Sequence, residues 1–89
     1  MKAPYLDVTF HRGKAVAAYL YLPRPAGAKA ARTIEARPNL LVDYMDDGQP
    51  IGIEILVPAE ADELLVNAVL GELNLPPLPA GELEPLRAA

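Results

Sequence analysis

The stretch LLVDYMDDGQPIGIEI, from Leu40 to Ile55, predicts the fold more clearly than any other part of the chain. Apolar and polar residues alternate on both sides of the dipeptide Asp47-Gly48, which is typical of half-buried β-strands. An Asp-Gly pair between two such runs favours a two-residue turn of type I′. The stretch is therefore predicted to form a β-hairpin. Its expected cross-strand pairs are Tyr44 with Ile51, Val42 with Ile53, and Leu40 with Ile55.

This register gives the hairpin one apolar and one polar face, because a strand alternates its side chains between the two sides of a sheet. Asp43, Gly52 and Glu54 fall on the polar face. The carboxylates of Asp43, Asp47 and Glu54 also match part of a calcium-loop template. The match is incomplete, since Met45 occupies a ligand position and strands cannot wrap enough oxygens around one ion. Turn and solvent roles are therefore favoured, and weak metal or small-ligand binding at this acidic hairpin is the alternative.

Three further strand patterns precede the hairpin. Segments 5–10 and 15–22 alternate in the same way around a turn at Gly13, and segment 32–36 is a short strand. A three-residue loop with Gly13 in a left-handed bulge is expected to pair Val8 with Val16 and Leu6 with Ala18. This register places on the second face of the sheet the residues Tyr5, Asp7, Tyr19 and Tyr21.

The C-terminal part of the sequence predicts a helix and a proline-rich tail. The helix is expected within 58–74, where Pro58 and several acidic residues suit a first helical turn. The tail, 75–89, is expected to run extended along the surface, with a short terminal helix around Leu83 and Leu86. Apolar residues at helical spacing form the stripe predicted to face the sheet: Ala61, Leu64, Leu65, Ala68, Val69 and Leu73, widened by Val66 and Leu70.

Strand patterns followed by one helix predict an α+β fold, with an antiparallel sheet of about five short strands in 5–57 and the C-terminal helix packed on one face. The whole chain, 1–89, is expected to be a single domain. The helix would cover the apolar face of the hairpin. The opposite face, called the open face below, would carry Tyr5, Tyr19, Tyr21, Leu41, Asp43 and Glu54.

The composition excludes several kinds of chemistry. The chain has 89 residues, no cysteine and no serine, which excludes disulfides, cysteine zinc sites and thiol or serine nucleophiles. The only histidine, His11, adjoins a glycine turn and is expected to be exposed. A net charge of −4 with scattered basic residues argues against nucleic-acid binding. No catalytic residue, cofactor or metal ligand is therefore predicted.

A membrane location is also not expected. No apolar run approaches the roughly 20 residues that a membrane helix needs. The N-terminus leads at once into a strand pattern and does not resemble a signal peptide. We therefore expect a cytoplasmic protein.

The hairpin and the segments before it resemble a known family. The residues that carry the resemblance are Ala18–Leu22, Arg32–Glu35, Leu41–Tyr44, Asp46–Gly48 and Ile51–Ile55. Together they are similar to domain of unknown function 2283, a bacterial group whose hairpin has the form D-Y-D-x-x-G-x-x-x-G-I-E-I. The similarity extends over residues 5–57 and has two departures, because Leu6 stands before Asp7 in place of Tyr and Met45 stands near Tyr44 where an Asp is usual.

The resemblance implies a small sheet domain with a C-terminal helix. It brings no established activity and no known catalytic residues. Because some members lie beside small toxin-like genes, it also implies, as one alternative, an antitoxin-like role with a small toxin as partner.

The open face is the predicted interaction surface, because tyrosine is enriched where proteins meet. A small domain without staples often gains core by self-association. We therefore expect a non-enzymatic domain that acts through protein–protein contact, either as a homo-oligomer such as a dimer or with a small protein partner. The alternative interpretation is an ordinary amphipathic surface with laterally packed tyrosines. An enzyme that uses Asp43 and Glu54 as a carboxylate pair is less favoured, since nothing in the sequence indicates a cleft.

Overall fold

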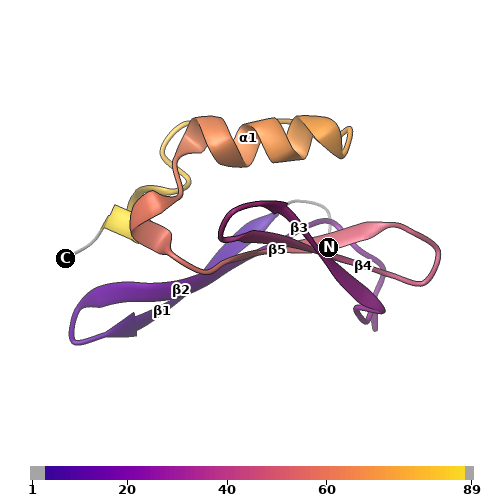
Figure 1. The fold of residues 1–89 in the computed structure, drawn as a ribbon, viewed down its shortest axis with the longest axis horizontal. Helices are drawn as coiled ribbons and strands as arrows, with labels where there is room; N and C mark the ends of the chain where they lie inside the picture. Colours follow the sequence, from indigo (N-terminus) through magenta and orange to yellow (C-terminus); the bar gives the residue numbers. More distant parts are fainter. Residues whose placement is uncertain (1–3, 88–89) are drawn as a thin grey trace.

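The computed structural model describes residues 4–87, which form a five-stranded antiparallel sheet, one α-helix and two short 3₁₀-helices (Figure 1). This confirms the predicted α+β fold. Residues 1–3 and 88–89 of the predicted domain lie outside the described residues. The strands are β1 (Tyr5–His11), β2 (Lys14–Tyr21), β3 (Arg32–Arg37), β4 (Leu40–Tyr44) and β5 (Pro50–Ile55). The helices are η1 (Pro58–Glu60), α1 (Glu63–Glu72) and η2 (Glu84–Arg87).

The strand order in the sheet is β1-β2-β5-β4-β3. The hairpin of β1 and β2 therefore joins the meander of β3, β4 and β5 through one non-local pairing, between β2 and β5. α1 and the tail lie on one side of this sheet, and Figure 1 shows the other side without a helix. This layering leaves the open face uncovered by any helix of the described residues.

The hairpin of β4 and β5 confirms two predicted pairs, Leu40 with Ile55 and Val42 with Ile53. The third prediction is wrong, because Tyr44 pairs with Pro50 and not with Ile51. The expected type I′ turn is wrong as well. Such a turn requires a positive φ at both central residues, and Gly48 has one (+91°) whereas Asp47 does not.

The turn contains one residue more than predicted. The amide of Gly48 donates to the carbonyl of Met45, and the amide of Met45 donates to the carbonyl of Gln49, which closes a three-residue loop. The amide of Gln49 also donates to the Asp47 carboxylate over 2.9 Å. A bulge at Ile51 offsets the added loop residue, so the apolar pairs deeper in the hairpin keep their predicted register.

The hairpin of β1 and β2 has the predicted faces but another register. Its turn has two central residues in left-handed conformation, Arg12 (φ 52°) and Gly13 (φ 80°), as a type I′ turn requires. The predicted three-residue loop is therefore wrong. The two-residue turn shifts the pairing by one residue and a bulge at Val16 shifts it by a second, so each side chain keeps its predicted face. The observed pairs include Leu6 with Leu20, Val8 with Ala18, Tyr5 with Tyr21 and Asp7 with Tyr19.

The helix is shorter than predicted. An extended break at Ala61 and Asp62 separates η1 from α1, and the Asp62 carboxylate caps α1 by accepting from the amide of Leu65 over 2.8 Å. The sheet-facing stripe also differs from the prediction, since Leu64 and Leu65 are 84% and 39% exposed and Ala68 is exposed as well. α1 is apolar on nearly every side, so its periodicity does not select one face. The residues of α1 that are buried are Val66, Val69 and Leu70.

The core lies between the sheet and the C-terminal segments, and the tail contributes directly to it. The expected surface course of the tail is corrected by its buried leucines, which are Leu78, Leu83 and Leu86. Two polar contacts fix the tail: the amide of Leu78 donates to Asn67 Oδ1 on α1, and the Arg87 guanidinium donates to the carbonyls of Pro58 and Ala61. The strands contribute Ala18, Leu20, Leu40, Val42, Ile53 and Ile55, and Leu22 joins them directly after β2.

No helix within residues 4–87 has both the length and the apolar character that a membrane crossing requires.

Candidate functional site

The open face brings the six predicted surface residues into two adjacent rows across the sheet. One row places Tyr19 beside Glu54 and Glu54 beside Leu41. The other row places Tyr5 beside Tyr21, Tyr21 beside Gly52, and Gly52 beside Asp43. The predicted register of β4 and β5 is what aligns Asp43 and Glu54 with the tyrosines of β2. The residues therefore form one continuous surface of aromatic and acidic side chains.

Asp43 is the centre of a hydrogen-bond network on this face. Asp43 is a buried charged residue, with 8% of its surface exposed. The Tyr19 hydroxyl donates to Asp43 Oδ2 over 2.8 Å, and the Thr33 hydroxyl of β3 donates to Asp43 Oδ1. Both carboxylate oxygens are thus engaged, which offsets part of the cost of burying the charge.

Gly52 makes the Tyr19–Asp43 hydrogen bond sterically feasible. The Tyr19 ring lies across this glycine, and a Cβ atom at residue 52 would stand 1.8 Å from the Tyr19 hydroxyl oxygen. Backbone φ is not the reason for glycine here, because Gly52 does not have a positive φ. The absence of a side chain at residue 52 therefore gives the tyrosine its path to Asp43.

Two ionisable groups on the face have shifted pKa values. Burial raises the pKa of Tyr19 to about 12, and the neighbouring Asp43 adds to this effect, whereas the positive charge of Arg24 acts in the opposite direction. Partial burial also raises the pKa of the Glu54 carboxyl, and the negative charge of Asp43 raises it further. Both shifts favour the neutral form of the group beside the Asp43 carboxylate.

The three tyrosines pack on one another. The rings of Tyr5 and Tyr21 stack with centroids 4.6 Å apart and planes 14° from parallel, and Tyr19 meets Tyr21 edge-on at 4.7 Å. The Arg24 guanidinium lies 4.8 Å from the centre of the Tyr21 ring. Lateral packing of this kind is what the alternative interpretation of an ordinary sheet surface predicts. It also fixes the ring orientations, so that the face has a defined shape.

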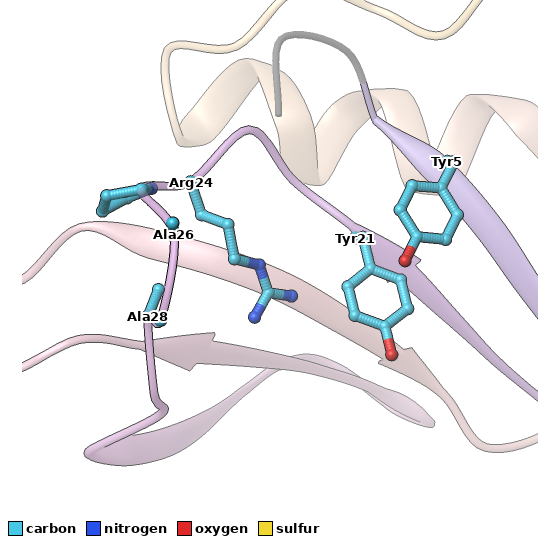
Figure 2. A pocket seen from close by; sticks show the side chains of 7 residues that line it. Tyr5, Tyr21, Arg24, Ala26 and Ala28 are labelled. Atoms are coloured by element: carbon cyan, nitrogen blue, oxygen red, sulfur yellow. The ribbon is translucent and has the colours of Figure 1, made fainter.

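A pocket adjoins the tyrosines at the end of β2. It has a volume of about 310 Å³ and is lined by Tyr5, Tyr21, Arg24 and residues 25–28 of the following loop. Figure 2 shows the Arg24 side chain between the Tyr21 ring and the backbone of Ala26 and Ala28. Most of the lining is apolar, and Arg24 brings the formal charge. The pocket is wide open to solvent, so it can admit a ligand without a movement of the backbone.

The carboxylates of the acidic hairpin do not form one cluster within the described residues. No three side chains of His, Cys, Asp or Glu in residues 4–87 lie close enough together to hold an ion. Asp47 accepts from the amide of Gln49 in the turn, whereas Asp43 lies on the open face. Turn chemistry separates the carboxylates that the calcium-loop template groups together.

Sequence reasoning missed three residues of this site. Thr33 was not expected beside Asp43, although alternation along β3 does place it on the open face. Gly52 was assigned to the right face without a role, because its importance depends on the Tyr19 ring angle. Arg24 lies in the proline-containing loop after β2, where no strand register positions a side chain. These three contacts depend on rotamers and loop conformation, which periodicity does not encode.

A comparison with protein-family models finds a match for the middle of the chain. Residues 17–57 match the family model described as "Protein of unknown function (DUF2283)", which confirms the resemblance predicted from the hairpin. The match runs from β2 through β5 and so includes Tyr19, Tyr21, Asp43 and Glu54. No curated protein and no solved structure matches the chain.

Proposed function

We propose that the domain is a non-enzymatic, cytoplasmic interaction module whose open face pairs with a second copy of the chain. The observation that carries this proposal is the layering of the fold, in which α1 and the tail cover one side of the sheet only. The other side presents tyrosine rings and carboxylates that hydrogen bonds and ring stacking already hold in place. A surface ordered in this way loses little conformational entropy on binding, which favours association.

A second copy suits this face for reasons of size and symmetry. The chain is small and has no disulfide, so additional buried surface would raise its stability markedly. A twofold interface brings the same patch of both copies together, and tyrosine rings serve on either side of such a contact. Tyr5 is the outermost ring, with 51% of its surface exposed. It is therefore the residue from which we expect the largest contribution to the contact.

The geometry of the carboxylate pair supports a non-enzymatic role. Both oxygens of Asp43 accept hydrogen bonds from the protein, so this carboxylate is engaged in the structure. Neither Asp43 nor Glu54 lines the pocket of about 310 Å³. Acid–base catalysis needs its carboxyl groups in a cleft that holds the substrate, and these two lie on a sheet surface.

The test compares substitutions of two exposed large residues, Tyr5 on the sheet and Leu64 on α1. Tyr5→Asp introduces a charge on the open face, and Leu64→Asp introduces the same charge on the outer side of α1, where Leu64 is 84% exposed. Light scattering and sedimentation across a range of dilutions would give the mass of each protein. We expect a concentration-dependent dimer for the unmodified chain and for Leu64→Asp, and a monomer for Tyr5→Asp.

Two outcomes would contradict the proposal. A monomer of the unmodified chain at every concentration would exclude self-association. Loss of the dimer in Leu64→Asp but not in Tyr5→Asp would move the interface to the helical layer. If the monomer instead formed a stable complex with a co-expressed small toxin-like protein, the antitoxin-like alternative would replace self-association.

A further inference from the structure

The pocket beside Tyr21 shares Tyr5 with the proposed self-association surface but has a chemical character of its own. Its walls are two stacked tyrosine rings, the side chains of Pro25, Ala26 and Ala28, and the guanidinium of Arg24. Its volume of about 310 Å³ lies at the lower end of the range for small-molecule sites. A pocket with apolar walls and one cation is suited to a ligand that has a flat apolar part and one negative charge.

Arg24 has two hydrogen-bond donors without an acceptor. Its Nε and Nη2 atoms are shielded from solvent and have no hydrogen-bond partner in residues 4–87. These two nitrogens form the edge of a guanidinium that pairs with a carboxylate through two parallel hydrogen bonds. Buried donors of a charged group are costly when they remain unpaired. An acceptor supplied by a ligand would therefore be strongly favoured at this edge.

The described part of the protein does not supply that acceptor. The Asp43 carboxylate on the same face already accepts from Tyr19 and Thr33. The ion pair found within residues 4–87 joins Arg37 to Glu72, on the opposite layer of the molecule. Instead of a carboxylate, Arg24 has the face of the Tyr21 ring, and this contact uses none of its N–H donors.

We propose that this pocket binds a small carboxylate with a flat apolar body, of the class of aromatic acids. The carboxylate oxygens accept from Nε and Nη2 of Arg24 once the flexible side chain turns its free edge toward the pocket. The body of the ligand lies against the rings of Tyr5 and Tyr21. A carboxylate fits better than inorganic phosphate, because a more highly charged and hydrated anion needs more donors than one guanidinium offers.

The probe for this site is benzoate, with acetate and inorganic phosphate as comparisons. Titrations followed by amide chemical shifts in NMR would give both the affinity and the location of each anion. We expect saturable benzoate binding, with the largest shifts in residues 24–28 and at Tyr5 and Tyr21. Acetate, which lacks the ring, and phosphate should each bind about tenfold more weakly or not at all.

The chain offers a matched control for the arginine. Arg32 also lies over a tyrosine ring, at 5.3 Å from the centre of Tyr44, but it does not line the pocket. Arg24→Gln should weaken benzoate binding at least tenfold, whereas Arg32→Gln should leave it unchanged. Arg24→Lys retains the charge and loses the forked edge, so it should also bind benzoate more weakly. If Arg24→Gln does not fold, Arg24→Lys tests whether the guanidinium binds the carboxylate.

Three results would overturn the proposal. The first is the absence of saturable benzoate binding to the unmodified protein. The second is equal benzoate affinity in Arg24→Gln or Arg24→Lys. The third is tighter binding of phosphate than of benzoate, which would replace the aromatic acid by another class of anion.

Discussion

At the scale of single residues, Gly52 shapes the open face because it has no side chain. The Tyr19 ring occupies the space that any side chain at residue 52 would need, and its hydroxyl then reaches Asp43. With a pKa of about 12, this hydroxyl remains protonated and able to donate even at a pH where an ordinary tyrosine ionises. One glycine therefore controls a hydrogen bond between two other strands.

Gly52→Ala should destabilise the protein by about 1 to 3 kcal/mol, because the added methyl group collides with Tyr19 and displaces its hydroxyl from Asp43. Urea unfolding would measure the loss. Gly71→Ala is the matched control, since nothing lies within 4 Å of a Cβ there. On helical propensity it should stabilise the protein by up to about 1 kcal/mol. Equal stability of Gly52→Ala and the unmodified chain would show that the ring does not depend on this glycine.

Glu54 gives the open face a defined response to pH. Its pKa is raised in the folded state, so folding favours the protonated carboxyl. The stabilising contribution of this group is therefore present below the ordinary pKa of glutamate and is lost as pH rises through the raised value. Glu54→Gln mimics the protonated form. It should be more stable than the unmodified chain at neutral pH, by less than about 1 kcal/mol because solvent screens this group.

The advantage of Glu54→Gln should disappear on acidification, which thermal unfolding at several pH values would show. Glu72→Gln provides a control of opposite sign. The partner Arg37 lowers the pKa of Glu72, so its contribution is present at neutral pH and is lost as pH falls through the lowered value. Glu72→Gln should therefore be slightly less stable at neutral pH. The same pH profile for both variants would contradict the assigned environments.

At the scale of elements, the sequence predicts the strands well and their turns poorly. Alternation identifies which residues share a face, and the six residues of the open face do come from the predicted strands. The two turn types are exchanged, since Arg12-Gly13 forms the two-residue turn and Asp47-Gly48 belongs to a three-residue loop. An arginine with positive φ is uncommon, so composition does not indicate it. In each hairpin a β-bulge offsets the unexpected loop length, so that the side chains keep their predicted faces. The sequence gives no signal for these bulges.

The face of α1 could not be predicted for a different reason. Leu64, Leu65 and Ala68 are as apolar as the residues that are buried, and only tertiary packing selects among them. The start of the helix does have a local cause, because Ala61 is extended and the Asp62 carboxylate accepts from the Leu65 amide. The capping residue therefore decides where α1 begins.

Asp62→Ala should lower the free energy of unfolding by about 1 kcal/mol, because the Leu65 amide loses its acceptor at the helix N-terminus. Asp62→Asn retains a side-chain oxygen and should cost only a small part of this. Chemical denaturation of the two variants would measure the difference. A loss as large in Asp62→Asn as in Asp62→Ala would show that charge, and not the hydrogen bond, is responsible.

At the scale of the whole molecule, the tail completes the core. Proline content correctly excludes a long helix there, but it does not reveal that Leu78, Leu83 and Leu86 are buried. Isolated leucines between prolines have no periodicity to interpret. The contact of Arg87 with two carbonyls near η1 adds a polar attachment for the same segment.

Leu86→Ala should destabilise the protein by about 2 to 4 kcal/mol, because it leaves a cavity where a side chain only 4% exposed now packs. Leu64→Ala is the matched control on α1 and should change stability by less than about 0.5 kcal/mol, since Leu64 is 84% exposed. Denaturant titration would compare the two. A smaller effect for Leu86 than for Leu64 would contradict the burial of the tail.

The strand order also has a consequence for the route of folding. The β1–β2 hairpin and the β3–β4–β5 meander each consist of sequence neighbours, so both can form through fast local contacts. The sheet becomes continuous only when Tyr21 meets Gly52 across the seam between β2 and β5. We expect the docking of these two units to limit the folding rate. The entropy of closing a loop grows only with the logarithm of its length, so insertions between β2 and β3 should slow this docking only slightly.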